Sequence, residues 1–193
     1  MLSTSARNSP GPSAQAYEAV DFMKTFVLRL GHRAGRDKRI STHCGLVARA
    51  FGADGIVYSG ERDESLMESI RKVSKQWGGK FEVRYEKNWR SFVNGWKGQI
   101  IHLTMYGLPV QKAIEKLDER DILVVVGGEK VPYEVYQMSD WNVSVTNQPH
   151  SEIAALSIFL DRLHEGKELA NEFPSANKKI IPQERGKKII EKT

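Results

Sequence analysis

The hydrophobic pattern of the chain changes between two periods. Short apolar or alternating runs predict strands at residues 26–30, 55–58, 81–85, 99–105, 122–126 and 141–145. Between them, apolar residues recur every three or four positions, which predicts helices at residues 42–51, 66–77, 88–96, 109–117, 132–139 and 151–163. This alternation is typical of an α/β fold with a parallel sheet and helices on both faces. Such sheets bind ligands at the carboxyl ends of their strands.

The first 22 residues do not follow this pattern. They are rich in Ser, Ala, Pro and Gly, and the run Pro10-Gly11-Pro12 is incompatible with regular structure. We therefore expect residues 1–22 to form a disordered extension, either an addition upstream of Met23 or a native arm. We expect residues 23–193 to form one domain.

The distribution of charge favours a polyanionic partner. The net charge is +5 and the isoelectric point about 9.3, a mild surplus that many soluble proteins share. Basic residues gather, however, in the segments 28–39 and 177–193, which predicts an RNA-binding surface. For the second segment, a solvated tail is the alternative. The candidate RNA-binding residues are Arg29, His32, Arg33, Arg36, Lys187 and Lys188.

Several other kinds of site are not indicated. Cys44 is the only cysteine, which excludes an intrachain disulfide and a cysteine-based zinc site and fits a reducing cytoplasm. The histidines lack metal-ligand spacing, so we expect no metal. No apolar run approaches the roughly 18 residues of a membrane span. The glycine motifs of Rossmann and P-loop nucleotide sites are also missing from the sequence.

Three strand-to-helix junctions, at residues 102–109, 126–132 and 146–152, have unusual compositions. In the second, Gly127-Gly128 directly follows a buried strand. Without a Cβ, backbone can approach a ligand closely, and the next helix offers free N–H groups. A tight turn that binds nothing is the alternative interpretation.

Together the three junctions resemble the cofactor-binding motifs of the SPOUT superfamily of methyltransferases. The resemblance implies that S-adenosylmethionine is the cofactor and that the C-terminal part of the sheet forms a trefoil knot around it. Two positions depart from the superfamily pattern, since Lys130 replaces a small residue and Pro149 replaces an Asn. The cofactor-binding residues implied are Leu103, Thr104, Tyr106, Gly107, Gly127, Gly128, Glu129, Lys130, Val131, Thr146, Asn147, Gln148, Pro149, His150, Ser151, Glu152 and Ile153.

The segment 43–54 resembles the first motif of the ribose methyltransferases in this superfamily. The resemblance implies that Arg49 is the catalytic arginine, and His43 stands where an Asn is usual. Because arginine is a poor base, we expect Arg49 to orient the ribose 2′-hydroxyl and the adjacent phosphate. His43 or His32 would then accept the hydroxyl proton.

A narrower resemblance extends from Phe26 to Ile190. The segments 28–33, 102–107 and 147–152 together resemble the archaeal family of tRNA (cytidine-56) 2′-O-methyltransferases. This family implies tRNA as the substrate, a homodimer and a cytoplasmic location. Two rival functions remain: a knotted methyltransferase acting on a base or on another RNA, and an RNA-binding α/β protein without catalytic activity.

For several residues a packing role competes with a functional one. Ser151 either contacts the cofactor or only caps a helix, and His102 either binds or packs in the core. Tyr106 either covers the cofactor or closes a hydrophobic cluster. Trp89 and Trp96 either stack on bases or pack at helical spacing. Helix 151–163 is apolar on more than one face, which predicts a dimer interface, with burial inside one domain as the alternative.

Overall fold

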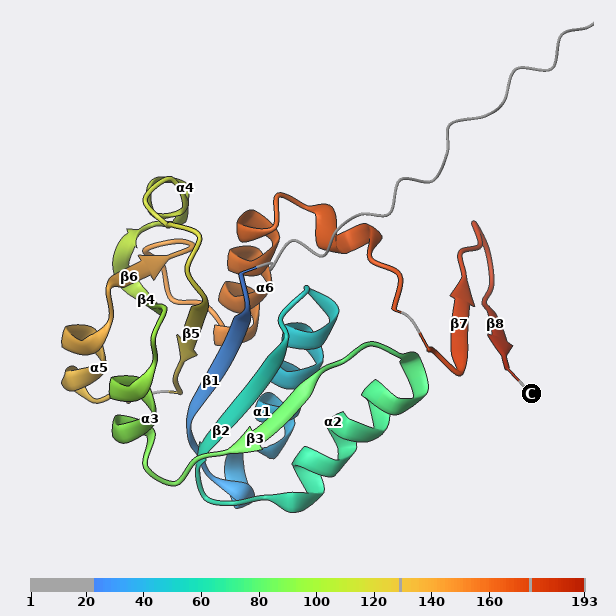
Figure 1. Cartoon of the computed structure of the whole chain (residues 1–193), viewed down its shortest axis with the longest axis horizontal. Coiled ribbons are helices and arrows are strands. Elements are labelled where there is room, and N and C mark those ends of the chain that lie inside the picture. The colour runs from blue at the N-terminus through green and yellow to red at the C-terminus, as the bar shows by residue number, and fades with distance from the viewer. Residues whose placement is uncertain (1–22, 129, 174, 193) are drawn as a thin grey trace, which may run out of the picture.

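A computed structural model of the chain describes residues 23–128, 130–173 and 175–192. The predicted extension at residues 1–22 and the cofactor-binding candidate Glu129 lie outside the described residues. The elements in chain order (Figure 1) are β1 Thr25–His32, α1 Ala34–Ala50, β2 Gly55–Gly60, α2 Glu64–Trp77, β3 Glu82–Tyr85, α3 Trp89–Gly95, β4 Gln99–Pro109, α4 Val110–Ile114, β5 Ile122–Val126, α5 Tyr133–Met138, β6 Trp141–Ser144, α6 Glu152–Leu163, a 3₁₀ turn η1 Lys167–Ala170, β7 Lys178–Ile181 and β8 Lys188–Glu191.

The first six strands form one sheet in the order β3-β2-β1-β5-β4-β6, and every pair in it is parallel. The α/β fold predicted from the alternation of elements is therefore confirmed. Since the strands are parallel, their carboxyl ends all lie at one edge of the sheet. The trefoil knot implied by the superfamily resemblance stays a prediction.

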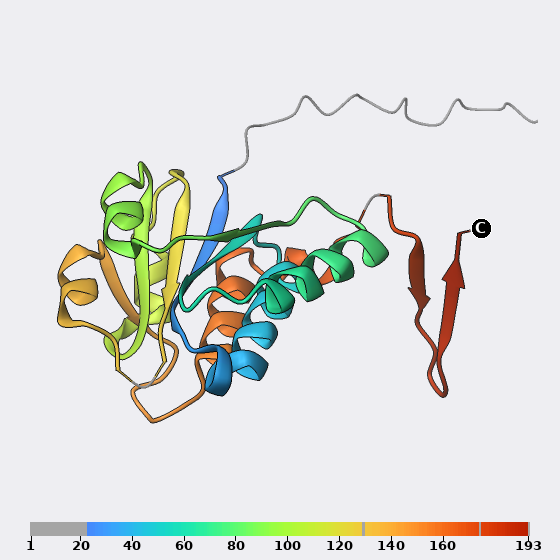
Figure 2. The same cartoon turned by 90° about the horizontal axis from the view of Figure 1, so that it is seen from below.

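The helices cover both faces of the sheet (Figure 2). On β1, Val27 packs in the cluster that includes residues of α1, α2, α4 and α6, whereas Phe26 and Leu28 pack in the cluster with residues of α3 and α5. Successive side chains of a strand point to opposite faces, so a strand covered on both sides is apolar throughout. The run Ile122–Val126 of β5 meets this condition, and all of its residues are buried.

Aspartate side chains close the amino edge of the sheet. Asp54, Asp121 and Asp140 each lie directly before a strand, and each accepts a hydrogen bond from a backbone N–H where a neighbouring strand begins. The donors are Thr25 at 2.8 Å, Lys24 at 2.9 Å and Ile100 at 2.7 Å, respectively. These bonds satisfy backbone groups that the strand ladder leaves unpaired. The carboxyl edge carries the three junctions instead.

Two element boundaries lie four or more residues from the predicted ones. Helix α1 begins at Ala34 rather than near Thr42, because Asp37 accepts hydrogen bonds from the backbone and guanidinium of Arg33 and so stabilises an earlier first turn. Strand β4 continues to Pro109, and α4 after it is only five residues long. The first two turns of α1 are charged and lack apolar periodicity, so the sequence pattern did not predict this earlier start of the helix.

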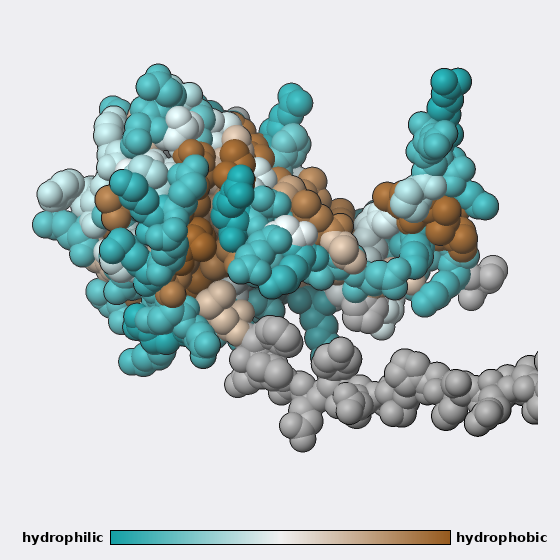
Figure 3. All heavy atoms as spheres, turned by 90° about the horizontal axis from the view of Figure 1, so that it is seen from above, coloured by the Kyte–Doolittle hydropathy of each residue, from teal (hydrophilic) through white to brown (hydrophobic). Residues whose placement is uncertain are grey.

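The C-terminal basic segment forms a hairpin of β7 and β8 that the hydrophobic pattern did not predict. It is joined to the amino edge of the domain, where the N–H of Asn177 donates to the carbonyl of Gln76 near the end of α2, at 3.0 Å. The side chains of Ile180, Ile189 and Ile190 are exposed. Figure 3 shows hydrophobic atoms gathered on this hairpin, apart from the body of the domain. Among the described residues, no helix combines the length and apolar character that a membrane crossing requires.

Candidate functional site

The three junctions predicted to carry chemistry meet at the carboxyl edge of the sheet. The first forms the later part of β4, and the other two follow β5 and β6. The strand order places these strands near one another although the junctions are about 20 residues apart in sequence. A cavity of about 330 Å³ lies between them. Its lining residues are His102, Leu103, Thr104, Met105, Tyr106, Gly127, Gly128, Val131, Tyr136, His150, Glu152 and Ala155. We call it the junction cavity.

Hydrogen bonds hold the first junction against the third. The Asn147 side-chain amide donates to the carbonyl of Met105 at 2.6 Å, and the Ser144 hydroxyl donates to the carbonyl of Gly107 at 3.1 Å. A Cβ on Gly107 would collide with the backbone between Asn142 and Val143, so only glycine allows this close approach. The shape of the junction cavity is therefore set by the protein before any ligand binds.

The N-terminus of α6 contributes a carboxylate to the cavity. Ser151 caps the helix, its hydroxyl accepting from the N–H of Ile153 at 3.1 Å, which confirms the capping interpretation of this residue. Glu152 follows in the first turn, where the helix dipole stabilises a negative charge. Its carboxylate lies 3.4 Å from the guanidinium of Arg29 on β1.

Arg29 is a buried cation beside the cavity. Its side chain is 2% exposed, and its Nη1 donates to the carbonyl of Leu30 at 2.7 Å. Its Nε has no hydrogen-bond partner among the described residues. A Cβ placed on Gly128 would lie 3.5 Å from Nη2 of Arg29, which shows that the guanidinium lies directly beside the second junction. Burying an arginine is costly unless its charge is paired and its remaining N–H groups also find acceptors.

His102, in the first half of β4, presents a hydrogen-bond acceptor without a donor. Asn142 donates through its amide nitrogen to the carbonyl of Tyr136 at 2.9 Å, so its oxygen faces Nδ1 of His102, also at 2.9 Å, and Nδ1 must carry the proton. Burial lowers the pKa of His102, an effect that the bond with Asn142 only partly opposes. The imidazole is therefore neutral, and its buried Nε2 has no hydrogen-bond partner among the described residues.

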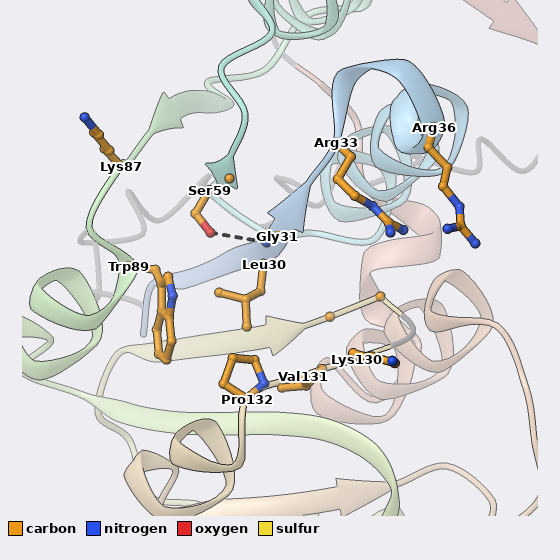
Figure 4. Close-up of a pocket in the computed structure, with 13 residues that line it drawn as sticks. Leu30, Gly31, Arg33, Arg36, Ser59, Lys87, Trp89, Lys130, Val131 and Pro132 are labelled. Carbon is orange, nitrogen blue, oxygen red and sulfur yellow. Dashed lines mark hydrogen bonds between the residues drawn. The ribbon is translucent and has the colours of Figure 1, made fainter.

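A second cavity of about 500 Å³ adjoins the first (Figure 4). It lies between the ends of β1 and β2 and the second junction, and we call it the β1–β2 cavity. Gly127, Gly128 and Val131 line both cavities and so form the boundary that they share. The residues that line the β1–β2 cavity are Leu30, Gly31, Arg33, Arg36, Ser59, Gly60, Lys87, Trp89, Gly127, Gly128, Lys130, Val131 and Pro132.

The structure brings together part of the predicted cofactor set. Leu103, Thr104, Tyr106, Gly127, Gly128, Val131, His150 and Glu152 line the junction cavity. Lys130 lines the β1–β2 cavity instead. The predicted residues that line neither cavity are Gly107, Thr146, Asn147, Gln148, Pro149, Ser151 and Ile153. Four of these have supporting roles: Gly107 and Asn147 join the junctions, Ser151 caps α6, and the carbonyl of Gln148 lies 2.9 Å from Nδ1 of His150.

The sequence pattern did not mark Met105, Tyr136 and Ala155 as residues that line a site. It also left open whether His102 binds a ligand or packs in the core. Tyr136 comes from α5, and its hydroxyl lies 3.3 Å from the hydroxyl of Thr104 across the cavity. Ala155 lies one turn into α6, three residues after Glu152. Helical spacing from Glu152 was a signal for Ala155, but nothing local in the sequence marked Tyr136.

Among the predicted RNA-binding residues, Arg33 and Arg36 line the β1–β2 cavity. His32, also predicted to bind RNA, ends β1 and is only 1% exposed. Its Nδ1 lies 2.9 Å from the hydroxyl of Ser41, and burial lowers its pKa despite the nearby Asp63. A side chain enclosed in this way does not face RNA.

The two basic clusters do not form one surface within one chain. Lys187 and Lys188 lie in the hairpin joined to the amino edge, whereas Arg33 and Arg36 lie at the carboxyl edge. A shared RNA-binding surface would therefore need either a second copy of the chain or an RNA long enough to reach both edges.

The structure does not bring Arg49 to either cavity. It lies in the last turn of α1, at the amino edge, where its guanidinium donates to the carbonyl of Gly78 at 2.7 Å and stacks 4.4 Å from the ring of Phe173. Both contacts give Arg49 a packing role, so the geometry does not support it as the catalytic arginine. His43 is exposed on α1 and lines neither cavity. Only a second copy of the chain could bring it to the site.

Comparison with known proteins identifies close relatives of the chain. A family described as tRNA ribose 2′-O-methyltransferase, aTrm56, matches residues 77–190. The chain is 54% identical over 170 residues to a tRNA (cytidine(56)-2′-O)-methyltransferase of Pyrococcus horikoshii, covering 86% of this chain and 84% of that protein. It is also 54% identical over 170 residues to the protein of the same name from Methanopyrus kandleri, covering 86% and 96%.

Solved structures share the fold at low sequence identity. The SpoU methyltransferase AviRb from Streptomyces viridochromogenes, solved in complex with the cofactor AdoMet, superposes with a TM-score of 0.54 at 13% identity over 75% of this chain. An rRNA methyltransferase from Sinorhizobium meliloti gives a TM-score of 0.56 at 18% identity over 79% of this chain. The chain spans only 58% and 62% of these two structures.

The glycine pair of the second junction provides a test of the site. A Cβ on Gly127 would collide with Val131, which lines both cavities, whereas a Cβ on Gly128 would meet only van der Waals contacts with Arg29. We therefore expect Gly127→Ala to weaken binding of S-adenosylmethionine, the cofactor that the superfamily resemblance implies, by about tenfold or more. Gly128→Ala should bind it nearly as the unmodified protein does. Calorimetric titration of both variants measures this, and equal affinities would contradict the placement of the cofactor beside Val131.

Proposed function

The chain belongs to the family of tRNA ribose 2′-O-methyltransferases, and we propose that it transfers a methyl group from S-adenosylmethionine to the ribose 2′-hydroxyl of cytidine 56 in tRNA. The match to the family and the 54% identity to proteins named for this reaction support the activity and the substrate. The observation that carries the proposal is the junction cavity, where the three junctions close on one space beside a buried arginine.

The residues of the junction cavity fit S-adenosylmethionine. Its volume, about 330 Å³, lies in the range of sites for molecules of this size. Leu103, Val131 and Ala155 offer apolar walls suited to an adenine ring. Glu152 supplies a carboxylate for the positive groups of the cofactor, and the neutral His102 offers Nε2 to a donor such as an amine or a hydroxyl.

When bound, the cofactor supplies an activated methyl group on a sulfonium. The protein must hold the 2′-hydroxyl in line with that methyl and help remove its proton. Arg29 replaces Arg49 in our assignment of the orienting cation, because it is buried at the boundary between the cavities and lacks a full set of partners. Its charge would attract the developing alkoxide and the adjacent phosphate.

His150 is our candidate for the proton acceptor, in place of His43 and the buried His32. Its Nδ1 lies 2.9 Å from the carbonyl of Gln148, and a carbonyl only accepts, so Nδ1 carries the proton. This hydrogen bond fixes the tautomer and leaves Nε2 as the basic atom of a residue that lines the junction cavity.

We also propose that the active form is a homodimer, with tRNA as its partner in the cytoplasm and with the C-terminal segment knotted as in the superfamily. Large hydrophobic side chains are exposed close to the cofactor loops, with Tyr106 77% exposed and Leu108 44% exposed. Ile158 of α6 and Ile40 of α1 are exposed as well. Apolar side chains grouped at a functional edge favour a protein interface there.

The central experiment is to map the methylated nucleoside. Incubation with labelled S-adenosylmethionine and an unmodified tRNA transcript should give label only in 2′-O-methylcytidine after digestion to nucleosides. A transcript carrying 2′-deoxycytidine at position 56 should accept no label, because the acceptor oxygen is missing. Label in a methylated base, or equal label in the deoxy transcript, would contradict the proposal.

A matched pair of arginine substitutions tests the revised catalytic assignment. Arg29→Lys keeps the buried charge but loses the planar fork that pairs with carboxylate and phosphate, so we expect kcat to fall by about tenfold or more. Arg49→Lys changes the same side chain at the opposite edge and should mainly lower the melting temperature, since its contacts are with Gly78 and Phe173. Single-turnover methylation and thermal unfolding separate the two effects. A large loss of kcat in Arg49→Lys alone would restore the original assignment.

The dimer is testable without activity. Sedimentation equilibrium at micromolar concentration should give twice the 21.8 kDa mass of the chain. A double substitution of exposed side chains, Leu108→Asp with Ile158→Asp, should shift the equilibrium towards monomer, because burying unpaired carboxylates in an interface is unfavourable. A fully active monomer of the unmodified chain would refute the dimer.

A further inference from the structure

We propose that the β1–β2 cavity binds the methyl-accepting nucleotide of the RNA, with its phosphate against the arginines of α1 and its base against Trp89. This inference rests on the proposed function, and it assigns the acceptor to a place separate from the junction cavity. Figure 4 shows the two kinds of wall that carry it.

One wall of the β1–β2 cavity is basic. Arg33 and Arg36 extend into it from the start of α1, and Lys130 approaches from the second junction (Figure 4). Arg33 is held in place by Asp37, with bonds of 2.8 and 3.0 Å to the carboxylate, which limits the freedom lost when a ligand binds. Cations at a cavity wall beside a helix N-terminus suit a phosphate.

The opposite wall is apolar and aromatic. Trp89 stands across the cavity from the arginines, with Leu30, Val131 and Pro132 between them (Figure 4). The guanidinium of Arg90 lies 4.5 Å from the Trp89 ring centroid, and Arg90 is itself paired with Glu134 at 2.6 Å, so the indole is supported from outside the cavity. An aromatic ring held in this way offers a platform on which any base can stack.

The order of these walls matches the order of groups in a nucleotide. Phosphate, ribose and base follow one another, so a phosphate at Arg33 and Arg36 and a base at Trp89 would leave the ribose in the middle of the cavity. The middle borders the segment Gly127-Gly128, which also lines the junction cavity. Two residues without a Cβ separate the cavities there, and Arg29 lies beside Gly128. The 2′-oxygen can thus face both the methyl donor and the orienting cation.

The β1–β2 cavity also restricts the conformation that the bound nucleotide can have within the RNA. A base that enters between Trp89 and Pro132 cannot remain stacked or paired with its RNA neighbours. The acceptor must therefore be an unpaired or extruded nucleotide, as for other enzymes that modify a base or ribose inside folded nucleic acid.

The test uses the fluorescence of Trp89 and needs no turnover. A short RNA stem-loop with the T-loop sequence of tRNA is titrated into the unmodified protein, and stacking on Trp89 should quench part of the tryptophan emission. Trp89→Phe should lose this part of the quenching yet retain most of the affinity, because phenylalanine also stacks. Trp89→Ala should bind the RNA about tenfold more weakly. Its affinity for S-adenosylmethionine, measured by calorimetry, should stay unchanged.

The basic wall has its own measurement. Arg36→Ala should reduce the slope of log affinity against log salt by about one, which corresponds to one lost phosphate contact. Lys72→Ala, which removes an exposed cation of α2 outside both cavities, is the matched control and should leave the slope unchanged. The proposal is overturned if Trp89→Phe quenches as strongly as the unmodified protein, or if Arg36→Ala and Lys72→Ala give the same slope. Either result is distinct from failure of the proposed function, in which the unmodified protein methylates no tRNA.

Discussion

A positive charge buried at the centre of the carboxyl edge constrains the whole site. The Arg29 side chain is 2% exposed on a central strand, and a guanidinium without water must be paired or the fold loses several kcal/mol. The carboxylate available is Glu152, which lies at the start of a helix more than 120 residues away in sequence. Pairing the two fixes the N-terminus of α6 beside β1, although β6, the strand before α6, lies at the far edge of the sheet. The third junction must therefore cross back over the ends of β4 and β5, and this crossing closes the junction cavity.

The two edges of the parallel sheet have different roles, one in fold stability and the other in ligand binding. At the amino edge, Asp54, Asp121 and Asp140 satisfy the backbone at strand starts, and Arg49 packs on Phe173, so this edge stabilises the fold. At the carboxyl edge, hydrogen-bonding capacity is left over: Nε of Arg29 and Nε2 of His102 are buried without partners among the described residues. Arg49 at the amino edge also has a buried nitrogen without a partner among the described residues, but Arg29 and His102 lie beside the cavity that the three junctions enclose, where a ligand can complete them.

The sequence predicted the architecture well, because strand and helix periods alternate and the run Ile122–Val126 could only be a strand covered on both faces. It also predicted which junctions meet, since parallel strands bring their carboxyl ends together. The resemblance implied Arg49 as the catalytic arginine and left Arg29 among the RNA-binding residues, whereas the geometry favours Arg29. Both lie in arginine-rich segments, but the early start of α1, stabilised by Arg33 and Asp37, carries Arg49 to the opposite edge. The spacing of residues within a motif does not show at which residue the helix begins, and so it does not show at which edge of the sheet the motif lies.

The same limit applies to individual side chains at the site. His32 ends β1 and His150 follows β6, yet the first is buried and the second lines a cavity, because β1 is central and β6 is an edge strand. Sequence pattern identifies a strand but not its place in the sheet. That place decides which histidine can exchange a proton with a substrate.

Hydrogen bonds hold several side chains of the site in place before any ligand binds. Asn147 and Ser144 hold the third junction on the first, Asn142 fixes the tautomer of His102, and Gln148 fixes that of His150. These groups are restrained in the protein without a ligand, so binding need not order them again. These restraints favour the reaction, because in-line methyl transfer depends on holding the two reactants within a few tenths of an ångström of their reactive positions. The β1–β2 cavity is supported in the same way, since Asp37 holds Arg33 and the ion pair of Arg90 with Glu134 supports Trp89. Two cavities shaped in advance let the two substrates bind at separate places and meet only across Gly127-Gly128.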